Sequence, residues 1–395
     1  MRGVVSGMVL LHHAYSMAPE VASLGAPAID RAFHTLMHFS PLRVFEFGRG
    51  PVLFFFVLSG YVLTRALLRN GSPGLLAFAA QRSVRLLLPV MASVGLSVVL
   101  WLLVFDAGLR NGALKAQVLG LWAQAPTLAD SLREATLLIT DIDPIILNPV
   151  LWSLVHEWRL TLLLPLVLLL RNQPGLLLAL ASLGTALGIL GGANENIVHL
   201  GPHLHSTLLA SCYFMLAIGS GVALAMAGPI PPVDRWLRLA GLVAAVALFG
   251  MRSDLAAYAG SALLIVLAQQ PGRLRQALRR PGLIWLGQVS FSLYLVHAPV
   301  LVAWLFLLHG SLPFWAIIAS GLVVAMAAAA VMHRLVEVPS RRLARWVERR
   351  LELRRPAAWG APSRTGGDRF WAAEGGMPVD PATREADDVG AGAGR

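Results

Sequence analysis

The chain has 395 residues, of which 56% are hydrophobic and only 13% are charged, and its mean hydropathy is +0.67. A soluble domain carries about 25% charged residues because its surface faces water, so this composition excludes an ordinary soluble protein. Its 32 Lys and Arg against 21 Asp and Glu give a net charge of +11; in a membrane protein, basic cytoplasmic loops explain this excess better than nucleic-acid binding does.

Long apolar runs recur along the chain, and a helix of about 20 such residues crosses a ~30 Å hydrocarbon core. The first run contains His12 and His13 and lacks a small-residue cleavage site, which favours a retained helix over a signal peptide. The sequence therefore predicts an all-α, polytopic transmembrane bundle of about ten spans. They lie at residues 3–18, 51–68, 84–105, 151–170, 175–192, 206–227, 237–250, 254–268, 285–308 and 313–334.

Basic residues collect in every second loop, whereas the alternate loops carry acidic or mixed charge, and residues 114–140 are placed in a long external loop at the membrane surface. Because positive residues stay in the cytoplasm, the pattern puts both termini on the cytoplasmic side of the cell membrane. The basic positions are Arg69, Arg82, Arg85, Arg171, Arg235, Arg238, Arg273, Arg275, Arg279 and Arg280, and then Arg341, Arg342, Arg345, Arg349 and Arg350.

Two regions follow from this pattern: an integral-membrane domain over residues 1–343, and a basic cytoplasmic segment with a tail over 344–395. From Pro356 the tail is rich in Gly, Ala and Pro, cannot bury a core, and is predicted to be disordered.

The single cysteine, Cys212, falls in a span and is interpreted as apolar packing. Four residues of one external loop have a spacing that could hold a metal, but solvated side chains are the favoured interpretation and no metal is expected. These four are Glu195, His199, His203 and His205.

Ionisable groups inside predicted spans cost several kcal/mol each, so each suggests a functional site. His13 follows Arg2 by eleven residues, which is three helical turns plus about 20°, so the two share one helix face ~16 Å apart. His12 points about 100° away and is interpreted as a bystander.

Glu157 lies six residues into a span that starts outside, at a depth of ~9 Å, and His297 lies ~18 Å from the cytoplasmic end of its own span. These depths predict that His13, Glu157 and His297 meet in one buried site between the midplane and the external third. A histidine can take a proton from an attacking hydroxyl, and a carboxylate can orient that histidine or accept a proton. The alternative for His297 is a hydrogen bond that only joins helices.

Arg82 and Arg85 are one helical turn apart at the predicted cytoplasmic end of the third span. Two arginines at i and i+3 form a fork for phosphate groups. The alternative is that they contact lipid headgroups or only set the topology.

At these residues the chain resembles the membrane acyltransferase-3 family, whose members O-acylate sugars, polysaccharides and other acceptors. The resemblance spans about residues 2–343 and depends on several short blocks that occur in the expected order. The blocks are Arg2 with His13-Ala14; Phe54-Phe55-Phe56-Val57-Leu58-Ser59-Gly60-Tyr61; Arg82-x-x-Arg85 with Pro89; Asn148-Pro149-x-Leu151-Trp152-Ser153-Leu154-x-x-Glu157; Ser290-Phe291-Ser292-Leu293-Tyr294-Leu295-x-His297; and Glu337-x-Pro339.

The resemblance implies an acyl-CoA donor, with acetyl-CoA expected, that enters from the cytoplasm, and an acceptor, carbohydrate or lipid-linked, that is acylated near the external side. It implies His13 as the base, Glu157 and His297 as further catalytic residues, and Arg2, Arg82, Arg85 and Tyr294 as donor-binding residues. Two departures stand out: Arg2 directly follows Met1, and Trp158-Arg159-Leu160 replaces a second acidic residue and an aromatic pair, which implies a different acceptor subgroup.

Two other functions compete with this interpretation. Midplane charges also mark substrate pathways, so the main alternative is a transporter or flippase without chemistry. A scaffold whose polar residues only lock helices together is disfavoured by the number of buried ionisable groups.

Overall fold

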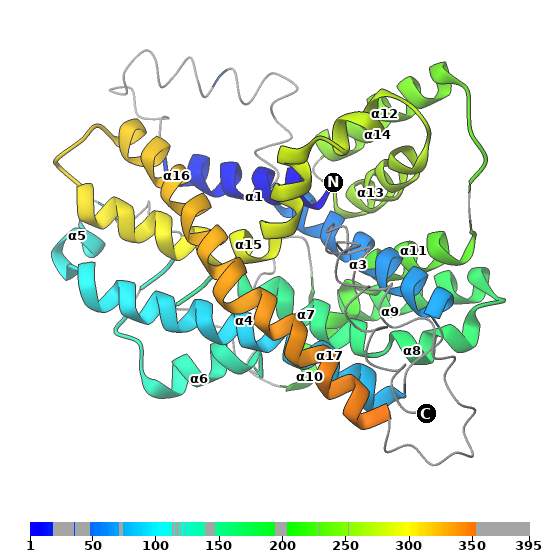
Figure 1. Ribbon diagram of the computed structural model, residues 1–395, viewed down its shortest axis with the longest axis horizontal. Helices are drawn as coiled ribbons and strands as arrows, with labels where there is room; N and C mark the ends of the chain where they lie inside the picture. Colours follow the sequence, from blue (N-terminus) through cyan, green and yellow to red (C-terminus); the bar gives the residue numbers. More distant parts are fainter. Residues whose placement is uncertain are drawn as a thin grey trace, which may run out of the picture.

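The computed structural model describes residues 1–18, 35, 48–70, 74–112, 114, 118, 120–122, 124–138, 147–193, 204–228, 230–251 and 253–352. The chain is all-helical, and none of these residues belongs to a β-strand, which confirms the predicted fold class (Figure 1). The helices are α1 (Arg2–Ser16), α3 (Arg49–Asn70), α4 (Leu75–Val104), α5 (Ala107–Asn111), α6 (Leu128–Thr136), α7 (Leu151–Leu162), α8 (Leu164–Val167), α9 (Pro174–Leu190), α10 (Leu204–Tyr213), α11 (Met215–Met226), α12 (Arg235–Gly250), α13 (Asp254–Gln269), α14 (Arg273–Leu278), α15 (Pro281–Leu308), α16 (Phe314–Met332) and α17 (Val338–Glu352).

Each predicted span coincides with one helix or with consecutive short helices, but the lengths differ. Four helices are long and apolar enough to cross a membrane: Arg49–Arg69, Leu75–Val104, Pro281–Leu308 and the continuous segment Phe314–Glu352. The segment from α7 to Leu170 adds a fifth if its 44° bend lies within one span. The chain is thus a helical membrane protein, while the count of ten spans stays a prediction.

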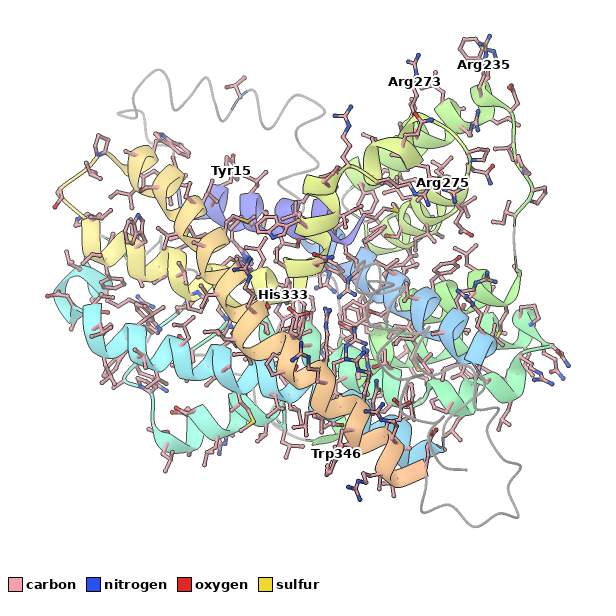
Figure 2. All side chains as sticks on the ribbon, viewed as in Figure 1. Tyr15, Arg235, Arg273, Arg275, His333 and Trp346 are labelled. Carbon is pink, nitrogen blue, oxygen red and sulfur yellow. The ribbon has the colours of Figure 1, made fainter. Side chains whose placement is uncertain are left out.

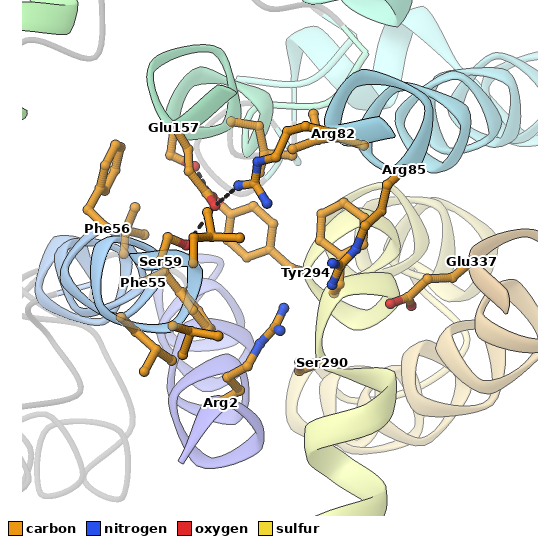
Figure 3. Close-up of a pocket in the computed structure, with 18 of the residues that line it drawn as sticks. Arg2, Phe55, Phe56, Ser59, Arg82, Arg85, Glu157, Ser290, Tyr294 and Glu337 are labelled. Carbon is orange, nitrogen blue, oxygen red and sulfur yellow. Dashed lines mark hydrogen bonds and ion pairs between the residues drawn. The ribbon is translucent and has the colours of Figure 1, made fainter. Parts of the chain in front are cut away.

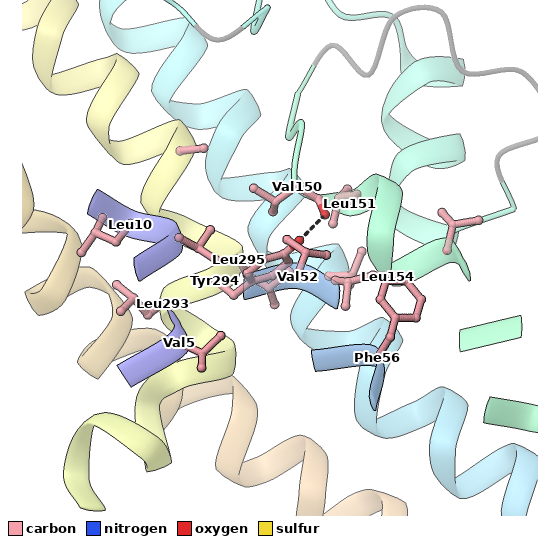
Figure 4. Close-up of a cluster of buried hydrophobic side chains, with 14 of the residues drawn as sticks. Val5, Leu10, Val52, Phe56, Val150, Leu151, Leu154, Leu293, Tyr294 and Leu295 are labelled. Atoms are coloured by element: carbon pink, nitrogen blue, oxygen red, sulfur yellow. Dashed lines mark hydrogen bonds between the residues drawn. The ribbon is translucent and has the colours of Figure 1, made fainter. Parts of the chain in front are cut away.

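The outer surface of the long helices is apolar. Leu102 and Leu103 on α4 and Val323 on α16 are 68%, 73% and 69% exposed. Large apolar side chains exposed along whole helices are expected where lipid, and not water, surrounds a protein. The interior is a single core in which α1, α3, α7 and α15 interlock through side chains such as Val5, Val52, Leu151 and Leu293 (Figure 4).

Small residues allow two helices to cross at backbone distance. A Cβ atom at Gly60 of α3 would lie 2.2 Å from the carbonyl oxygen of Ile218, and one at Gly221 of α11 would lie 1.9 Å from that of Val57. Glycine is therefore required at both positions, as is common where membrane helices pack closely. This crossing fixes the middle of α3, whose Phe55 and Ser59 line the site described below.

Pro299 breaks the hydrogen-bond ladder of α15 because proline has no N–H to donate to the carbonyl of Leu295. Asn148, just before α7, fills this gap: its side-chain Nδ2 donates to the Leu295 oxygen at 2.7 Å. Glu134 of α6 holds the same segment, since its carboxylate accepts from the backbone N–H groups of Leu147 and Asn148, both at 3.0 Å. These three hydrogen bonds place the start of α7 against the turn of α15 that carries His297.

The sequence places Glu134 in the long external loop over residues 114–140, but its side chain is buried, with only 4% exposed. Its part of the loop folds into α6, whose first turn is closed by reciprocal hydrogen bonds between Thr127 and Asp130. The backbone N–H groups of Leu147 and Asn148 lie in the core, where water does not reach them. The buried carboxylate of Glu134 accepts a hydrogen bond from each and so satisfies both.

Candidate active site

A polar pocket opens among α1, α3, α4, α7, α15 and α17 (Figure 3). Its volume is about 90 Å³, enough for a small charged group. Four arginines and two glutamates line it, a formal net charge of +2 that favours an anion. The charged lining residues are Arg2, Arg82, Arg85, Arg341, Glu157 and Glu337.

Arg82 is tied to α7. Its Nη2 donates to the Glu157 carboxylate at 2.9 Å, and its Nε donates to the Thr161 hydroxyl at 3.0 Å. Ser59 of α3 donates to the same carboxylate oxygen of Glu157 at 2.7 Å. Glu157 therefore holds three helices together and fixes the guanidinium of Arg82 at the pocket wall.

This contact changes the predicted position of Arg82 relative to Glu157. The sequence placed Glu157 beside the two histidines and away from Arg82, but Glu157 contacts Arg82 directly. The reason is that α4 begins at Leu75 and not near residue 84, so Arg82 lies seven residues, or ~10 Å, inside the helix. Among the described residues, the carboxylate of Glu157 bonds to Ser59 and Arg82 and not to a histidine.

Arg2 and Arg85 point into the pocket from α1 and α4 (Figure 3). The guanidinium of Arg2 makes no hydrogen bond or ion pair to any residue that the structure describes. On the far wall, the buried carboxylate of Glu337 accepts from Ser292 at 2.5 Å and pairs with His333 at 3.0 Å and with Arg341. His333–Glu337 forms a π-helical turn, a distortion that is frequent at functional sites.

Tyr294 forms the wall between this pocket and the predicted base. Its hydroxyl donates to the Val150 carbonyl at 3.0 Å and lies 2.6 Å from the Ser153 hydroxyl (Figure 4). Its ring lies edge-on to Phe55, with centroids 6.2 Å apart, and 6.1 Å from the ring of His297. Tyr294 thus touches the pocket on one side and the histidine pair on the other.

His13 and His297 meet, as the sequence predicted, although they are 284 residues apart. Nδ1 of His13 lies 2.7 Å from Nε2 of His297, and the rings are nearly coplanar, with centroids 5.0 Å apart and planes at 12°. His297 is 1% exposed, whereas His13 is half-buried. Nδ1 of His297 lies 2.9 Å from the backbone carbonyl of Leu293.

These contacts determine which nitrogen of His13 is free. A carbonyl oxygen can only accept, so Nδ1 of His297 carries the proton that it shares with Leu293. His297 is buried in apolar surroundings without an acidic partner among the described residues, which favours its neutral form, so its Nε2 must accept. His13 therefore donates through Nδ1, and the lone pair of its Nε2 is left to accept a proton from a substrate.

His12 has different neighbours, as predicted from its helical angle. Its Nε2 lies 3.4 Å from the Ser16 hydroxyl, and its ring packs on the backbone of Gly48, where a Cβ atom would lie 2.0 Å from it. The chain just before α3 therefore runs directly against the dipeptide that contains His13.

A second buried polar cluster was not predicted from the sequence. Arg49, at the start of α3, pairs with Asp254, at the start of α13, and three aromatic rings surround the guanidinium. His156 lies beside it, 3% exposed, with Nδ1 3.0 Å from the Ser211 hydroxyl. One available signal was that Arg49 and Asp254 carry opposite charges and both flank predicted spans at the predicted external end.

Some sequence predictions fall outside the described residues. These include most of the loop cluster of Glu195, His199, His203 and His205, and the tail beyond residue 352. Within the described ranges, no three His, Cys, Asp or Glu side chains are grouped in a way that could hold a metal ion.

Comparison with known proteins gives one match. No curated protein and no solved structure matches the chain. The family model described as an acyltransferase domain matches residues 1–334, which include every site residue discussed above except the last turn of the pocket wall, from Glu337 to Arg341. The match confirms the resemblance that the sequence blocks indicated, and the chain belongs to the membrane acyltransferase-3 family.

Proposed function

We propose that this membrane acyltransferase moves an acyl group, acetyl in the simplest case, from cytoplasmic acyl-CoA to a hydroxyl of a sugar, a polysaccharide or a lipid-linked acceptor. The observation that carries the proposal is the hydrogen-bonded pair of His13 and His297, which leaves Nε2 of His13 as a base. The cationic pocket on the other side of Tyr294 suits an anionic donor.

The pocket supports a phosphate-bearing donor. Arg2 and Arg85 come from different helices and aim at one space, and charge-assisted hydrogen bonds to phosphate are among the strongest that side chains make. Because the volume is only about 90 Å³, the pocket suits one phosphate or the narrow pantetheine arm, while the nucleotide lies outside. Tyr294 lines the end of the pocket nearest to the histidines.

The reaction needs one proton to be moved. Nε2 of His13 accepts the proton of the acceptor hydroxyl as the hydroxyl oxygen bonds to the thioester carbonyl carbon. The carbon–sulfur bond then breaks, and the departing sulfur of coenzyme A takes the proton back from His13. The products are an ester and free coenzyme A, and no further reactant is required.

Glu157 has a different role in this scheme from the one predicted. Because its carboxylate neutralises and positions Arg82, we assign it to the donor pocket and not to the chemistry at His13.

A transporter or flippase is the competing function, since buried charges also line transport paths. The test is to incubate the purified protein with labelled acetyl-CoA and with an envelope fraction from cells that lack the gene. We expect release of coenzyme A and label in the envelope fraction. A purified, folded protein that releases no coenzyme A and labels nothing would favour transport.

Donor binding is tested at Arg85. We expect Arg85→Ala to weaken acyl-CoA binding by about ten- to a hundred-fold, because one charge-assisted hydrogen bond contributes ~1.5–3 kcal/mol. Arg85→Lys should restore only part of the affinity, since it loses the planar fork. Isothermal titration with acetyl-CoA measures both. Unchanged affinity in Arg85→Ala would leave this arginine as a topology signal.

The topology is tested by thiol labelling in a Cys212→Ala background. We expect cysteines at Ser72 and Gln276 to resist an impermeant thiol reagent in intact cells, because basic residues surround both positions. Arg235, Arg273 and Arg275 gather at the edge of the molecule near Gln276 (Figure 2). A cysteine at Ser131 of α6 is the matched external control and should be labelled. Labelling at position 72 or 276 without permeabilisation would reverse the orientation.

A further inference from the structure

A second cavity lies at the start of α12, between that helix and the chain that joins α13 to α14. This groove has a volume of about 400 Å³, within the range of cavities that hold small organic ligands. It shares no lining residue with the donor pocket. Arg235 and Arg238 of α12 and Arg273 of α14 line it, and no acidic residue is found among its described lining residues. The groove therefore favours an anion.

Hydrogen bonds within the chain hold the walls of the groove in place. Gln270, at the end of α13, is buried: its Nε2 donates to the carbonyl of Pro231 at 3.3 Å, and its Oε1 accepts from the N–H of Val233 at 3.0 Å. Arg238 donates to the carbonyl of Pro271. These bonds join the start of α12, and the segment before it, to the end of α13. The groove is thus formed before any ligand arrives.

Two of the three arginines are available to a ligand. Arg235 and Arg273 are exposed, and their guanidinium groups form no hydrogen bond or ion pair with any residue in the described part of the chain. Arg235 stacks over the ring of Trp236, with Cζ 4.9 Å from the centroid. The adjacent carboxylate of Asp234 accepts from the backbone N–H of Trp236 at 3.3 Å. Both guanidinium groups can therefore donate to phosphate oxygens.

The rest of the groove is apolar and continues into the outer surface of α12. Four leucines line it: Leu239, Leu242, Leu267 and Leu274. Beyond the groove, α12 packs mainly against α13, and its outer side chains Val243 and Val246 are exposed. Trp236, also exposed, lies at the charged end, and tryptophan is enriched where membranes meet water. Cations, an indole and an apolar helix face thus follow one another in the order of a lipid headgroup and its acyl chain.

We propose that this groove binds an anionic phospholipid, with the phosphate against Arg235 and Arg273 and an acyl chain along the exposed face of α12. The phosphate contacts alone would also suit a soluble anion. The apolar lining favours the lipid, because a soluble phosphate leaves the leucines uncovered whereas an acyl chain packs on them. The predicted cytoplasmic position of these arginines suits the anionic lipids of that leaflet. The site does not depend on the proposed acyl transfer.

The test is native mass spectrometry of the purified full-length protein in a neutral detergent. The probes are phosphatidylglycerol and phosphatidylcholine with the same acyl chains. We expect Arg235→Gln and Arg273→Gln each to lower the affinity for phosphatidylglycerol by about five-fold, the contribution of one basic side chain near an anionic lipid, and the double variant by about 25-fold. Phosphatidylcholine, whose headgroup has no net charge, should bind the wild-type protein about as weakly as phosphatidylglycerol binds the double variant.

Arg275→Gln is the matched control. It removes the same charge from α14 at the same edge of the molecule, but Arg275 does not line the groove (Figure 2). We expect it to change the affinity for phosphatidylglycerol by less than about two-fold, since exposed charges farther away are screened by salt. Inorganic phosphate and acetyl-CoA, added to the wild-type protein as soluble competitors, should not displace the lipid.

Each other result would overturn the site. Equal binding of the two lipids, or an equal loss in Arg275→Gln and the groove variants, would mean that no specific headgroup site exists. Displacement by inorganic phosphate would assign the groove to a soluble anion, and displacement by acetyl-CoA would assign it to the donor. A double variant that binds phosphatidylglycerol as the wild type does, but changes its oligomeric state, would make the groove a contact between copies of the chain.

Discussion

Replacing His13 with Ala should lower turnover by about 10²- to 10⁴-fold, the usual contribution of a general base. A hydroxyl loses its proton far above neutral pH, so efficient attack on a thioester requires a base beside it. Nε2 of His13 is that base because its Nδ1 is engaged by His297. The binding of acetyl-CoA, measured by isothermal titration, should change little, since His13 is not among the residues that line the donor pocket.

His12→Ala is the internal control for this experiment. It removes the same group one position away, so it reports any damage to α1, whereas the 2.7 Å bond to His297 is made by His13. We expect it to keep most of the turnover. A dead His12→Ala beside an active His13→Ala would mean that the wrong histidine has been chosen, and normal transfer by both would refute base catalysis from α1.

Much of the candidate site was predictable from the sequence because lipid makes polar residues conspicuous. An ionisable side chain in an apolar run needs a partner, and this alone singled out His13 and His297. Helical geometry put Arg2 on the face of His13 and set His12 apart, and in the structure Arg2 lines the pocket while His12 has other contacts. These inferences depend on one helix at a time, for which sequence periodicity is a good guide.

The relative heights of different helices were less predictable. The position assigned to Arg82, at the end of its span, assumed that α4 begins at the edge of its apolar run, whereas α4 begins at Leu75 because nothing in Leu75–Gln81 interrupts a helix. Arg82 consequently meets Glu157 inside the protein. A hydropathy boundary marks where the side chains change polarity, and the backbone hydrogen bonds need not end there.

Two other pairings between distant parts of the chain were not predicted. Asn148 satisfies the carbonyl that Pro299 leaves unpaired, and Arg49 pairs with Asp254 across 205 residues of chain. Each partner has an ordinary local sequence, and only the packing of the bundle shows that the two are adjacent. Such pairs are required because a buried polar group without a partner costs about 1–3 kcal/mol.

The second large effect is expected at His297, which acts on the reaction through His13. His297→Leu removes the acceptor for Nδ1–H of His13, so the imidazole is no longer held with its proton on Nδ1. With the proton on Nε2, His13 cannot accept one from the acceptor hydroxyl, and the imidazolium that forms during attack loses its partner. We expect turnover to fall by about 10²-fold or more, the lower bound of general-base catalysis.

His297→Gln distinguishes this role from a packing role. The amide oxygen of Gln can accept from Nδ1–H of His13, so it should hold the same tautomer, while its shape and its bond to Leu293 differ from those of histidine. Turnover of His297→Gln should therefore lie well above that of His297→Leu. Nitrogen-15 NMR of labelled histidine reports the tautomer directly, and we expect protonation of His13 at Nδ1 in the wild type and in His297→Gln but not in His297→Leu.

The comparison also decides between the two interpretations of His297. If His297 only joins α15 to α1, both variants should lose thermal stability to a similar degree, and turnover per folded molecule should stay near wild type. If it orients the base, His297→Leu should lose turnover even when the protein is folded and binds acetyl-CoA normally, because the donor pocket lies on the other side of Tyr294. A folded His297→Leu protein with wild-type turnover would remove His297 from the mechanism and leave His13 to act without a fixed tautomer.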